Sequence, residues 1–484
     1  MSTPLELHED RLFPAEPGIR ALARELYANV ADLPIISPHG HTDPAWFAHD
    51  EPFGNATELL LHPDHYVFRM LYSQGIALED LGIGGGEADP RAAWRIFADN
   101  YHLFRATPSR MWLDWVFAKA FGIEVRLDAG TADHYFDTIT EKLQQDDFRP
   151  RALFDRYGIE VLATTESPLD PLDHHRAIRG SGWGGRVITA YRPDPVVDPE
   201  FEGFADNLRA FGDLTGEDTL SWPGYLAAHR QRREYFAAMG ATSTDHGHPT
   251  AATANLSDAD AAALFERVKH GGASAADAEL FRAQMLTEMA AMSVDDGLVM
   301  QIHPGSFRNH NHQLFAGFGR DMGADIPTRT DYVQALKPLL DRFGNEAELS
   351  IILFTLDEFI ECGCPSAQQN GPHQGVKKQN KVDQPYRRAQ IKTCRRGEHH
   401  QQGHPGFGQL IKGAELPIKS RSCRCGFHRH GVFPARATSI GSSSSCSTTP
   451  CVILSPAIRL AARRRAPTAR WEVAINTRSG VGCT

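Results

Sequence analysis

Short apolar runs that end in polar clusters recur along the first 358 residues. Runs of this length suit buried strands, and the stretches between them suit helices. The stretch 274–292 is one such helix, because Ser274 can cap it and Asp277 follows three residues later. Strands that alternate with helices predict parallel βαβ units. The predicted strands are residues 33–37, 159–165, 187–191, 241–244, 298–302 and 349–355.

Two further segments have helical patterns. Residues 17–31 predict an amphipathic helix, since Pro17 suits the first turn and Ile19, Leu22, Leu26 and Val30 recur at helical spacing. Residues 45–155 are mostly helical in pattern and rich in aromatic side chains. We expect them to form a helical insertion with its own small core.

The polar clusters at the strand ends decide between two α/β architectures. Functional groups at the carboxyl ends of parallel strands are typical of a (β/α)8 barrel. An open doubly wound sheet would favour a Gly-rich phosphate loop after the first strand, and residues 38–44 contain none. The sequence therefore predicts an α/β fold of the TIM-barrel type, with the helical insertion after strand one.

Two histidines follow the first predicted strand. His39 and His41 are two residues apart, so at a strand end both imidazoles turn to the same face and can share a metal ion. Neutral imidazoles suit zinc or another borderline divalent ion. Such a site needs at least one more ligand from another strand.

Other strand ends carry acid–base and cationic groups. Asp245 follows the fourth predicted strand and His303 the fifth, and either can act as an acid or base beside a metal; the alternative is that they cap loops. Arg192 and Arg308 are candidate clamps for a carboxylate, although a single arginine is more often part of a surface ion pair.

Six segments follow one another along residues 1–358: PHGHTDP at 38–44, DHYVFRML at 64–71, TAYRPD at 189–194, TDHGHPT at 244–250, MQIHPGSFRNHN at 300–311 and LSIILFTLDE at 349–358. Together they resemble the uronate isomerase family, an unusual branch of the amidohydrolase superfamily. The resemblance implies a distorted (β/α)8 barrel, metal ligation by His39 and His41, and site roles for Arg192, Asp245 and His303. It adds His65 and Tyr66 to the catalytic set, although periodicity alone gives Tyr66 a packing role.

The reaction that this resemblance implies is an aldose–ketose isomerisation of D-glucuronate to D-fructuronate and of D-galacturonate to D-tagaturonate. A proton leaves C2 of the open-chain sugar and returns to C1 through an enediol, while Arg192 holds the carboxylate. The alternatives are a metal-dependent hydrolase on the same barrel and an inactive paralogue whose basic tail binds polyanions. The RPD and DHY segments favour the isomerase.

Composition changes abruptly after residue 358. The segment 359–484 holds 20 Lys and Arg against 5 Asp and Glu, whereas residues 1–358 hold 30 against 55, and all 8 cysteines lie in the later segment. The resemblance implies a Trp-Trp motif and a last strand ending in an Asp that ligates the metal, but neither follows here. Strands seven and eight are therefore not recognisable. We expect this exact chain to be poorly stable or inactive, because an unclosed barrel exposes two edges.

Three hypotheses account for the segment 359–484. A shifted reading frame explains the change in charge and cysteine use together, and it is the one we favour. A disordered basic tail that binds an acidic partner is the second. The third is a small metal module, which the Cys-x-Cys spacing disfavours; its ligands would be Cys394, Cys423, Cys425, His428 and His430.

The remaining expectations concern partners and location. Residues 1–13 have acids and no apolar run, and no stretch approaches the length of a membrane span, so we expect a cytoplasmic protein. The acidic balance of residues 1–358 argues against nucleic acid as a partner. The expected ligand is a small hexuronate, and the sequence leaves open whether the chain forms a homo-oligomer.

Overall fold

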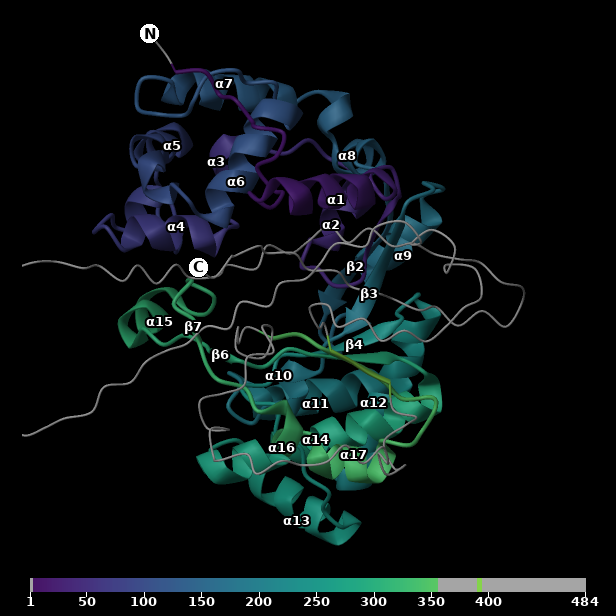
Figure 1. The fold of residues 1–484 in the computed structure, drawn as a ribbon. Coiled ribbons are helices and arrows are strands. Elements are labelled where there is room, and N and C mark those ends of the chain that lie inside the picture. The colour runs from purple at the N-terminus through teal and green to yellow at the C-terminus, as the bar shows by residue number, and fades with distance from the viewer. Residues whose placement is uncertain (1–2, 356–389, 394–484) are drawn as a thin grey trace, which may run out of the picture. The chain divides into compact units, whose positions relative to one another are not determined.

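A parallel sheet carries the fold in the computed structural model, which describes residues 3–355 and 390–393 (Figure 1). Its seven strands lie in the order β1-β2-β3-β4-β5-β8-β9, so neighbours in the sheet are neighbours in the chain. The six strands that the sequence predicts are confirmed, and each pairs in parallel with the next. They are β1 (Ile35–Ser37), β2 (Ile159–Glu166), β3 (Arg186–Tyr191), β4 (Ser243–His246), β5 (Val299–Ile302) and β8 (Ser350–Leu353).

The seventh strand, β9 (Gln390–Thr393), lies where the sequence pattern predicts no strand. It pairs in parallel with β8, from Ser350 with Gln390 to Leu353 with Thr393. Ladder hydrogen bonds join main-chain groups, so this pairing needs no apolar pattern. The hypotheses of a disordered basic tail and of a small metal module in 359–484 concern residues outside the described ranges.

Burial explains why the central strands read as continuous apolar runs. In β3 every residue from Val187 to Tyr191 is buried, and all four residues of β4 are buried. Parallel strands covered by helices on both faces show this pattern. Polar residues inside such strands, including Thr189 and Asp245, are therefore unusual and mark groups that need partners.

Helices lie between β1 and β2, where the sequence predicts a helical insertion. Figure 1 shows them gathered in one group, coloured purple to blue. Their core is aromatic, with Trp94, Phe97, Tyr101, Phe117 and Tyr135 fully buried. The helices are α2 (Pro44–His49), α3 (Ala56–Leu60), α4 (His65–Tyr72), α5 (Pro90–Asp99), α6 (Pro108–Trp115), α7 (Ala132–Leu143) and α8 (Pro150–Arg156), with shorter turns η1 (Glu79–Leu81), η2 (Tyr101–Phe104), η3 (Val116–Ala120) and η4 (Asp146–Phe148).

A second core lies between the sheet and the helices that connect its strands. It includes Tyr191 of β3, Phe236, Phe281 and Met300 of β5, all fully buried. Helices α9 and α12 contact β3, and α14 contacts β5. The helices are α9 (Asp173–Gly180), α10 (Asp194–Val197), α11 (Phe204–Thr215), α12 (Trp222–Ala238), α13 (Asp258–Val268), α14 (Ala275–Asp296), α16 (Tyr332–Ala335) and α17 (Lys337–Phe343).

The segment after β5 reaches the helical insertion. Its antiparallel pair, β6 (Ser306–Phe307) and β7 (Ile326–Pro327), encloses α15 (His312–Phe318). Leu314 of α15 is buried in the aromatic core of the insertion. Arg69 of α4 donates a hydrogen bond to the carbonyl of Gly323 at 3.2 Å. This segment therefore links the carboxyl end of the sheet to the helix that carries the DHY motif.

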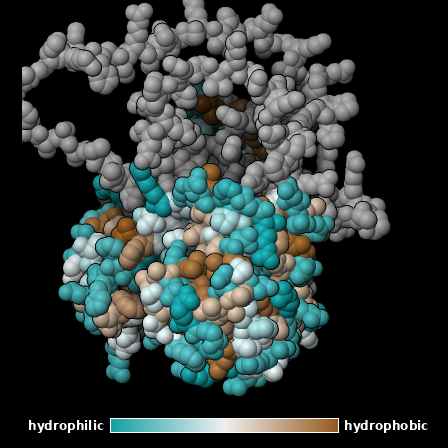
Figure 2. Space-filling model, turned by 90° about the horizontal axis from the view of Figure 1, so that it is seen from below, coloured by the Kyte–Doolittle hydropathy of each residue, from teal (hydrophilic) through white to brown (hydrophobic). Residues whose placement is uncertain are grey.

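The N-terminal helix α1 spans Pro17–Ala28, slightly less than the predicted 17–31. Its periodic apolar residues are exposed, with Ile19 at 57% and Leu22 at 56%. Elsewhere the described surface seen in Figure 2 is mostly hydrophilic, with apolar side chains scattered over it. None of the helices in the described part of the chain is both long and apolar enough to cross a membrane.

Candidate active site

His39 and His41 lie in the loop that follows β1, and β2 fixes the path of that loop. Thr165 of β2 donates a hydrogen bond from Oγ1 to the carbonyl of Gly40 at 2.8 Å. A Cβ atom at Gly40 would lie 3.1 Å from the carbonyl oxygen of Ala163. Glycine between the two histidines therefore lets the loop lie directly against the neighbouring strand.

Gln301 of β5 sets the orientation of His39. Its Nε2 donates to the carbonyl of Pro38 at 3.0 Å, so its Oε1 faces Nδ1 of His39 at 2.7 Å. An amide oxygen only accepts hydrogen bonds, so this arrangement favours the His39 tautomer with the proton on Nδ1. Nε2 of His39 then keeps its lone pair, as a metal-binding imidazole requires.

Asp245 is the centre of the polar cluster. It is fully buried at the end of β4, and three cationic or titratable groups surround its carboxylate. Nε2 of His303 lies 2.5 Å from Oδ1, Nη1 of Arg192 lies 3.4 Å from Oδ2, and Nδ1 of His39 lies 3.8 Å from Oδ1. Burial alone would raise the pKa of Asp245, but the contact with His303 and the charge of Arg192 outweigh it and hold that pKa well below its usual range.

Asp194 holds Arg192 in place beside this carboxylate. Nε of Arg192 donates to Oδ2 of Asp194 at 2.7 Å, and the main-chain N–H of Gly247 donates to Oδ1 at 3.1 Å. Burial opposes ionisation of Asp194, yet the charge of Arg192 lowers its pKa, so the pair is ionic. One carboxylate thus joins the ends of β3 and β4 and directs the guanidinium group toward Asp245.

The donor set fits a metal ion. Ligand atoms of His39, Asp245 and His303 all lie within 4.8 Å of one another, and no other group of three or more such residues in the described ranges meets this condition. Both carboxylate oxygens of Asp245 and Nε2 of His303 are buried without a hydrogen bond of acceptable geometry among the described residues. Two imidazoles and a carboxylate are ligands typical of zinc and related divalent ions.

His41 adjoins this group without belonging to it. Its ring centroid lies 5.2 Å from that of His39. Burial lowers the pKa of His41 to about 4, with a smaller contribution from the charge of His39. The imidazole is therefore neutral near pH 7, the form that binds metals.

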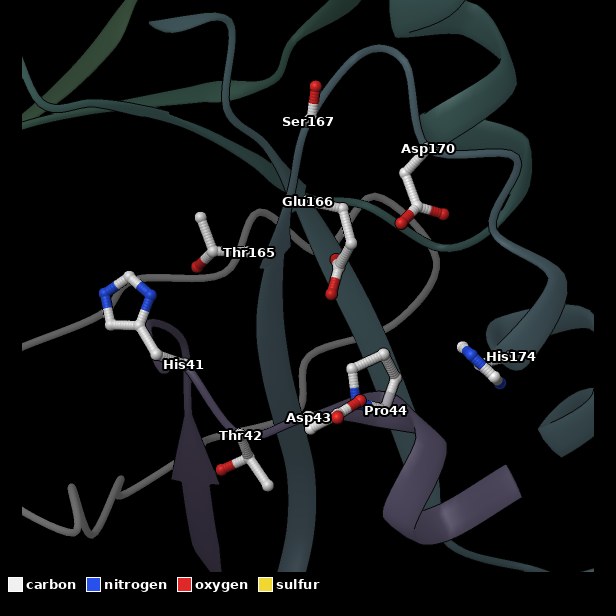
Figure 3. A pocket seen from close by; sticks show the side chains of 9 residues that line it. All are labelled: His41, Thr42, Asp43, Pro44, Thr165, Glu166, Ser167, Asp170 and His174. Carbon is white, nitrogen blue, oxygen red and sulfur yellow. The ribbon is translucent and has the colours of Figure 1, made fainter. Parts of the chain in front are cut away.

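A cavity of about 390 Å³ opens beside His41 at the carboxyl ends of β1 and β2. Figure 3 shows the side chains that line it. Three of them are carboxylic acids, Asp43, Glu166 and Asp170, and His174 lines it from α9. Burial raises the pKa of Glu166 to about 7, although hydrogen bonds from Thr189 and Thr164 oppose that rise.

The structure brings four of the eight predicted site residues into direct contact, namely His39, Arg192, Asp245 and His303. His65 and Tyr66 lie in the first turn of α4, where Asp64 caps the helix. Nη1 of Arg308 lies 3.8 Å from Oδ1 of Asp321 and 3.9 Å from Oδ2 of Asp325. Within residues 3–355, no hydrogen bond or ion pair joins His65, Tyr66 or Arg308 to the four residues that are in contact.

Sequence reasoning gives no role to Gln301, Asp194, Gly247 or Glu166. Gln301 had a usable signal, because it is a polar residue inside the apolar strand VMQI. Asp194 and Glu166 also follow predicted strands, but nothing in the local pattern pairs them with their partners. Gly247 owes its importance to close contacts with three side chains, which only the folded structure reveals.

Comparison with known families gives one match over most of the chain. A family model described as glucuronate isomerase matches residues 18–379. The uronate isomerase of Sphingopyxis alaskensis is 72% identical over 362 residues, which cover 74% of this chain and 77% of that protein. The uronate isomerase of Xanthomonas campestris pv. campestris is 69% identical over 363 residues, with 74% and 77% covered.

Solved structures of uronate isomerases also resemble this fold. The crystal structure of glucuronate isomerase from Caulobacter crescentus shares 62% identity at a TM-score of 0.72, over 73% of this chain and 75% of that one. The uronate isomerase of Thermotoga maritima shares 26% identity at a TM-score of 0.67, over 73% and 76%. The likeness therefore extends to sequence, fold and about three quarters of each relative's length.

Proposed function

The chain belongs to the glucuronate isomerase family, and we propose that it interconverts hexuronates, D-glucuronate with D-fructuronate and D-galacturonate with D-tagaturonate. The observation that carries this proposal is the buried cluster around Asp245, which combines a candidate metal site with a guanidinium group at the carboxyl ends of parallel strands. We infer that these strands are part of a (β/α)8 barrel, which places its active site at this end.

Arg192 binds the carboxylate of the hexuronate in this proposal. Its Nε and Nη1 face Asp194 and Asp245, which leaves Nη2 for the substrate. A hydrogen bond between a guanidinium nitrogen and a carboxylate is charge-assisted, and burial strengthens such contacts. Arg308 supplies a second cation from the segment after β5, where it pairs with Asp321 and Asp325. The charges of the same two acids act on His65, and we propose that Arg308, His65 and Tyr66 contact the same substrate.

A divalent ion, which we propose to be zinc, is held by His39 and Asp245 with one further imidazole, either His41 or His303. When bound, the ion acts as a Lewis acid that stabilises negative charge on a substrate oxygen. The imidazole that does not hold the ion is the acid–base group. It takes the proton from C2 and returns it to C1.

The proposal treats residues 359–484 as the product of a shifted reading frame. The relative from Sphingopyxis alaskensis matches 362 residues of this chain, and the family model ends at residue 379. The charge balance changes after residue 358. The last quarter of the family's chain then has no counterpart here. Turnover by the 484-residue chain is therefore expected to be low. Replacing residues 359–484 with the last quarter of a relative should restore it.

The experiment compares the full chain with a hybrid in which residues 1–358 continue into the last quarter of the Sphingopyxis alaskensis relative. Both are loaded with zinc and incubated with D-glucuronate, and the ketose is measured by NMR. We expect turnover by the hybrid and its loss in a hybrid carrying both His39→Ala and His41→Ala. A folded, zinc-loaded hybrid without turnover contradicts the proposed function.

Two single variants of the hybrid then separate the roles of the imidazoles. Zinc content and turnover are measured for His41→Ala and for His303→Ala. The variant that loses zinc identifies the third ligand, and the variant that keeps zinc but loses turnover identifies the acid–base group. Retention of both properties in either variant contradicts this division of roles.

A further inference from the structure

Glu166 occupies an unusual position at the carboxyl end of β2. Its side chain is 7% exposed, and it lines the cavity beside His41. In Figure 3 its carboxyl group points into that cavity, toward Asp43 and Pro44. A buried carboxyl group directed into a polar cavity loses hydration and needs partners to compensate.

Two threonine hydroxyls satisfy one oxygen of this carboxyl group. Thr164 donates to Oε2 at 2.8 Å, and Thr189 of β3 donates to the same atom. Thr164 in turn accepts from Nε2 of His175, at 2.9 Å, because its own proton goes to Glu166. The carboxyl group is therefore held in one orientation, while Oε1 makes no hydrogen bond among the described residues and remains open to the cavity.

The charges around the cavity determine which part of a hexuronate can enter it. Asp43 and Asp170 line it together with Glu166, and both raise the pKa of Glu166. A substrate carboxylate in this cavity would meet like charges. Neutral hydroxyl groups can donate to the same acids, and the volume of about 390 Å³ lies within the range of small-molecule sites.

The cationic end of the site lies elsewhere. Arg192 faces the Asp245 cluster at the ends of β3 and β4, and it does not line the cavity. A bound hexuronate therefore has its carboxylate toward Arg192 and its hydroxyl-bearing carbons toward the acids. His41 lies between the two regions, since it lines the cavity and its ring adjoins that of His39.

We infer that Glu166 binds a hydroxyl group of the hexuronate through Oε1, with Thr164 and Thr189 as the residues that orient it. This inference rests on the proposed function and assigns the cavity to the polyol part of the substrate. Near neutral pH the group can both accept and donate a hydrogen bond, because burial brings its pKa to about 7. The ionised carboxyl group can accept a hydrogen bond from a sugar hydroxyl, and the protonated one can donate a hydrogen bond to it.

The test measures binding to the zinc-loaded full chain by calorimetry, with two probes. D-glucuronate carries both the carboxylate and the hydroxyl groups, whereas hexanoate carries only the carboxylate. Glu166→Ala is expected to weaken D-glucuronate binding at least 10-fold, as the loss of a hydrogen bond to a charged group does, and to change hexanoate binding less than 2-fold. Glu160→Ala, an exposed glutamate on the same strand, is the matched control and should change neither.

The remaining outcomes contradict either the inference alone or the proposed function as well. Unchanged D-glucuronate binding in Glu166→Ala overturns the inference and leaves the proposed function intact. Equal losses for both probes also overturn it, because they assign Glu166 a purely structural role; thermal unfolding of each variant reports that loss of structure separately. If the parent chain and the Glu160→Ala control bind hexanoate but no D-glucuronate, the proposed function fails, and the inference fails with it.

Discussion

Gly247 lies against three side chains of the cluster, and Gly247→Ala tests the geometry of the site directly. The added methyl carbon would lie 2.6 Å from Nη2 of Arg192, 2.7 Å from Oδ2 of Asp194 and 3.2 Å from Cε1 of His303. Favourable contacts of a carbon atom occur at about 3.5 Å or more. The methyl group therefore has to displace the guanidinium and the carboxylate by roughly 0.8–0.9 Å.

The displaced groups cannot move freely, which sets the size of the effect. Asp194 receives hydrogen bonds from Arg192 at 2.7 Å and from the main chain of Gly247 at 3.1 Å, so relief of the clash breaks or lengthens both. Overpacking of this kind costs about 1–3 kcal/mol of folding stability. A misplacement of about 1 Å lowers turnover about 100-fold when the shifted group positions the substrate.

The assay combines urea unfolding, followed by tryptophan fluorescence, with hexuronate turnover in the hybrid described above. Gly184→Ala is the matched control, because Gly184 is exposed and a Cβ atom there meets nothing within 4 Å. We expect Gly247→Ala to lose both stability and turnover while the control loses neither. Equal unfolding midpoints and equal turnover for the two variants would refute the placement of Arg192 and Asp194.

Three further predictions follow from the site and the tail. Glu166 has a pKa of about 7 when folded against 4.5 for an ordinary glutamate, so the folded state binds more protons in that window and loses up to about 3 kcal/mol of stability as pH rises through it. Urea unfolding at pH 5 and pH 8 should show this decline in the parent and not in Glu166→Gln; equal declines contradict it. His39→Ala and Asp245→Asn should each lower zinc affinity at least 10-fold in equilibrium dialysis, and unchanged affinity would remove them from the ligand set. Translation of the nucleotide sequence in the other two frames beyond codon 358 should recover a Trp-Trp segment and an Asp-x-Arg segment, and their absence from both frames rejects the frame shift.

The strands can be predicted from the sequence because burial restricts the residue types that they contain. A strand covered on both faces must be apolar throughout, and its first exposed residues are polar, so both the run and its end are visible in the chain. β9 does not follow this rule, because it is not a continuous apolar run. Of its residues, Gln390–Thr393, only Ile391 is apolar, and main-chain pairing with β8 defines the strand.

The site is less predictable because its geometry depends on contacts across strands. Position at a strand end is enough to suggest His39, Asp245 and His303, and the structure brings them together. The residues that orient these side chains cannot be predicted from the local sequence. The contact of Gln301 with His39, for example, joins residues 262 positions apart. His65 and Tyr66 came from family resemblance alone, and their catalytic roles stay predictions.

The strand order of the sheet repeats the order in which a ribosome makes the chain. Each of β2, β3, β4, β5 and β8 can pair with the strand of this sheet that was synthesised before it, so none has to wait for a later strand. While strands are added in this order, the last strand made has an unpaired edge that can pair with another chain. The other exposed edge belongs to β1, which has a strand neighbour on one side only within the described residues. It is the first edge to emerge during translation, so it is available for unintended pairing for the longest time.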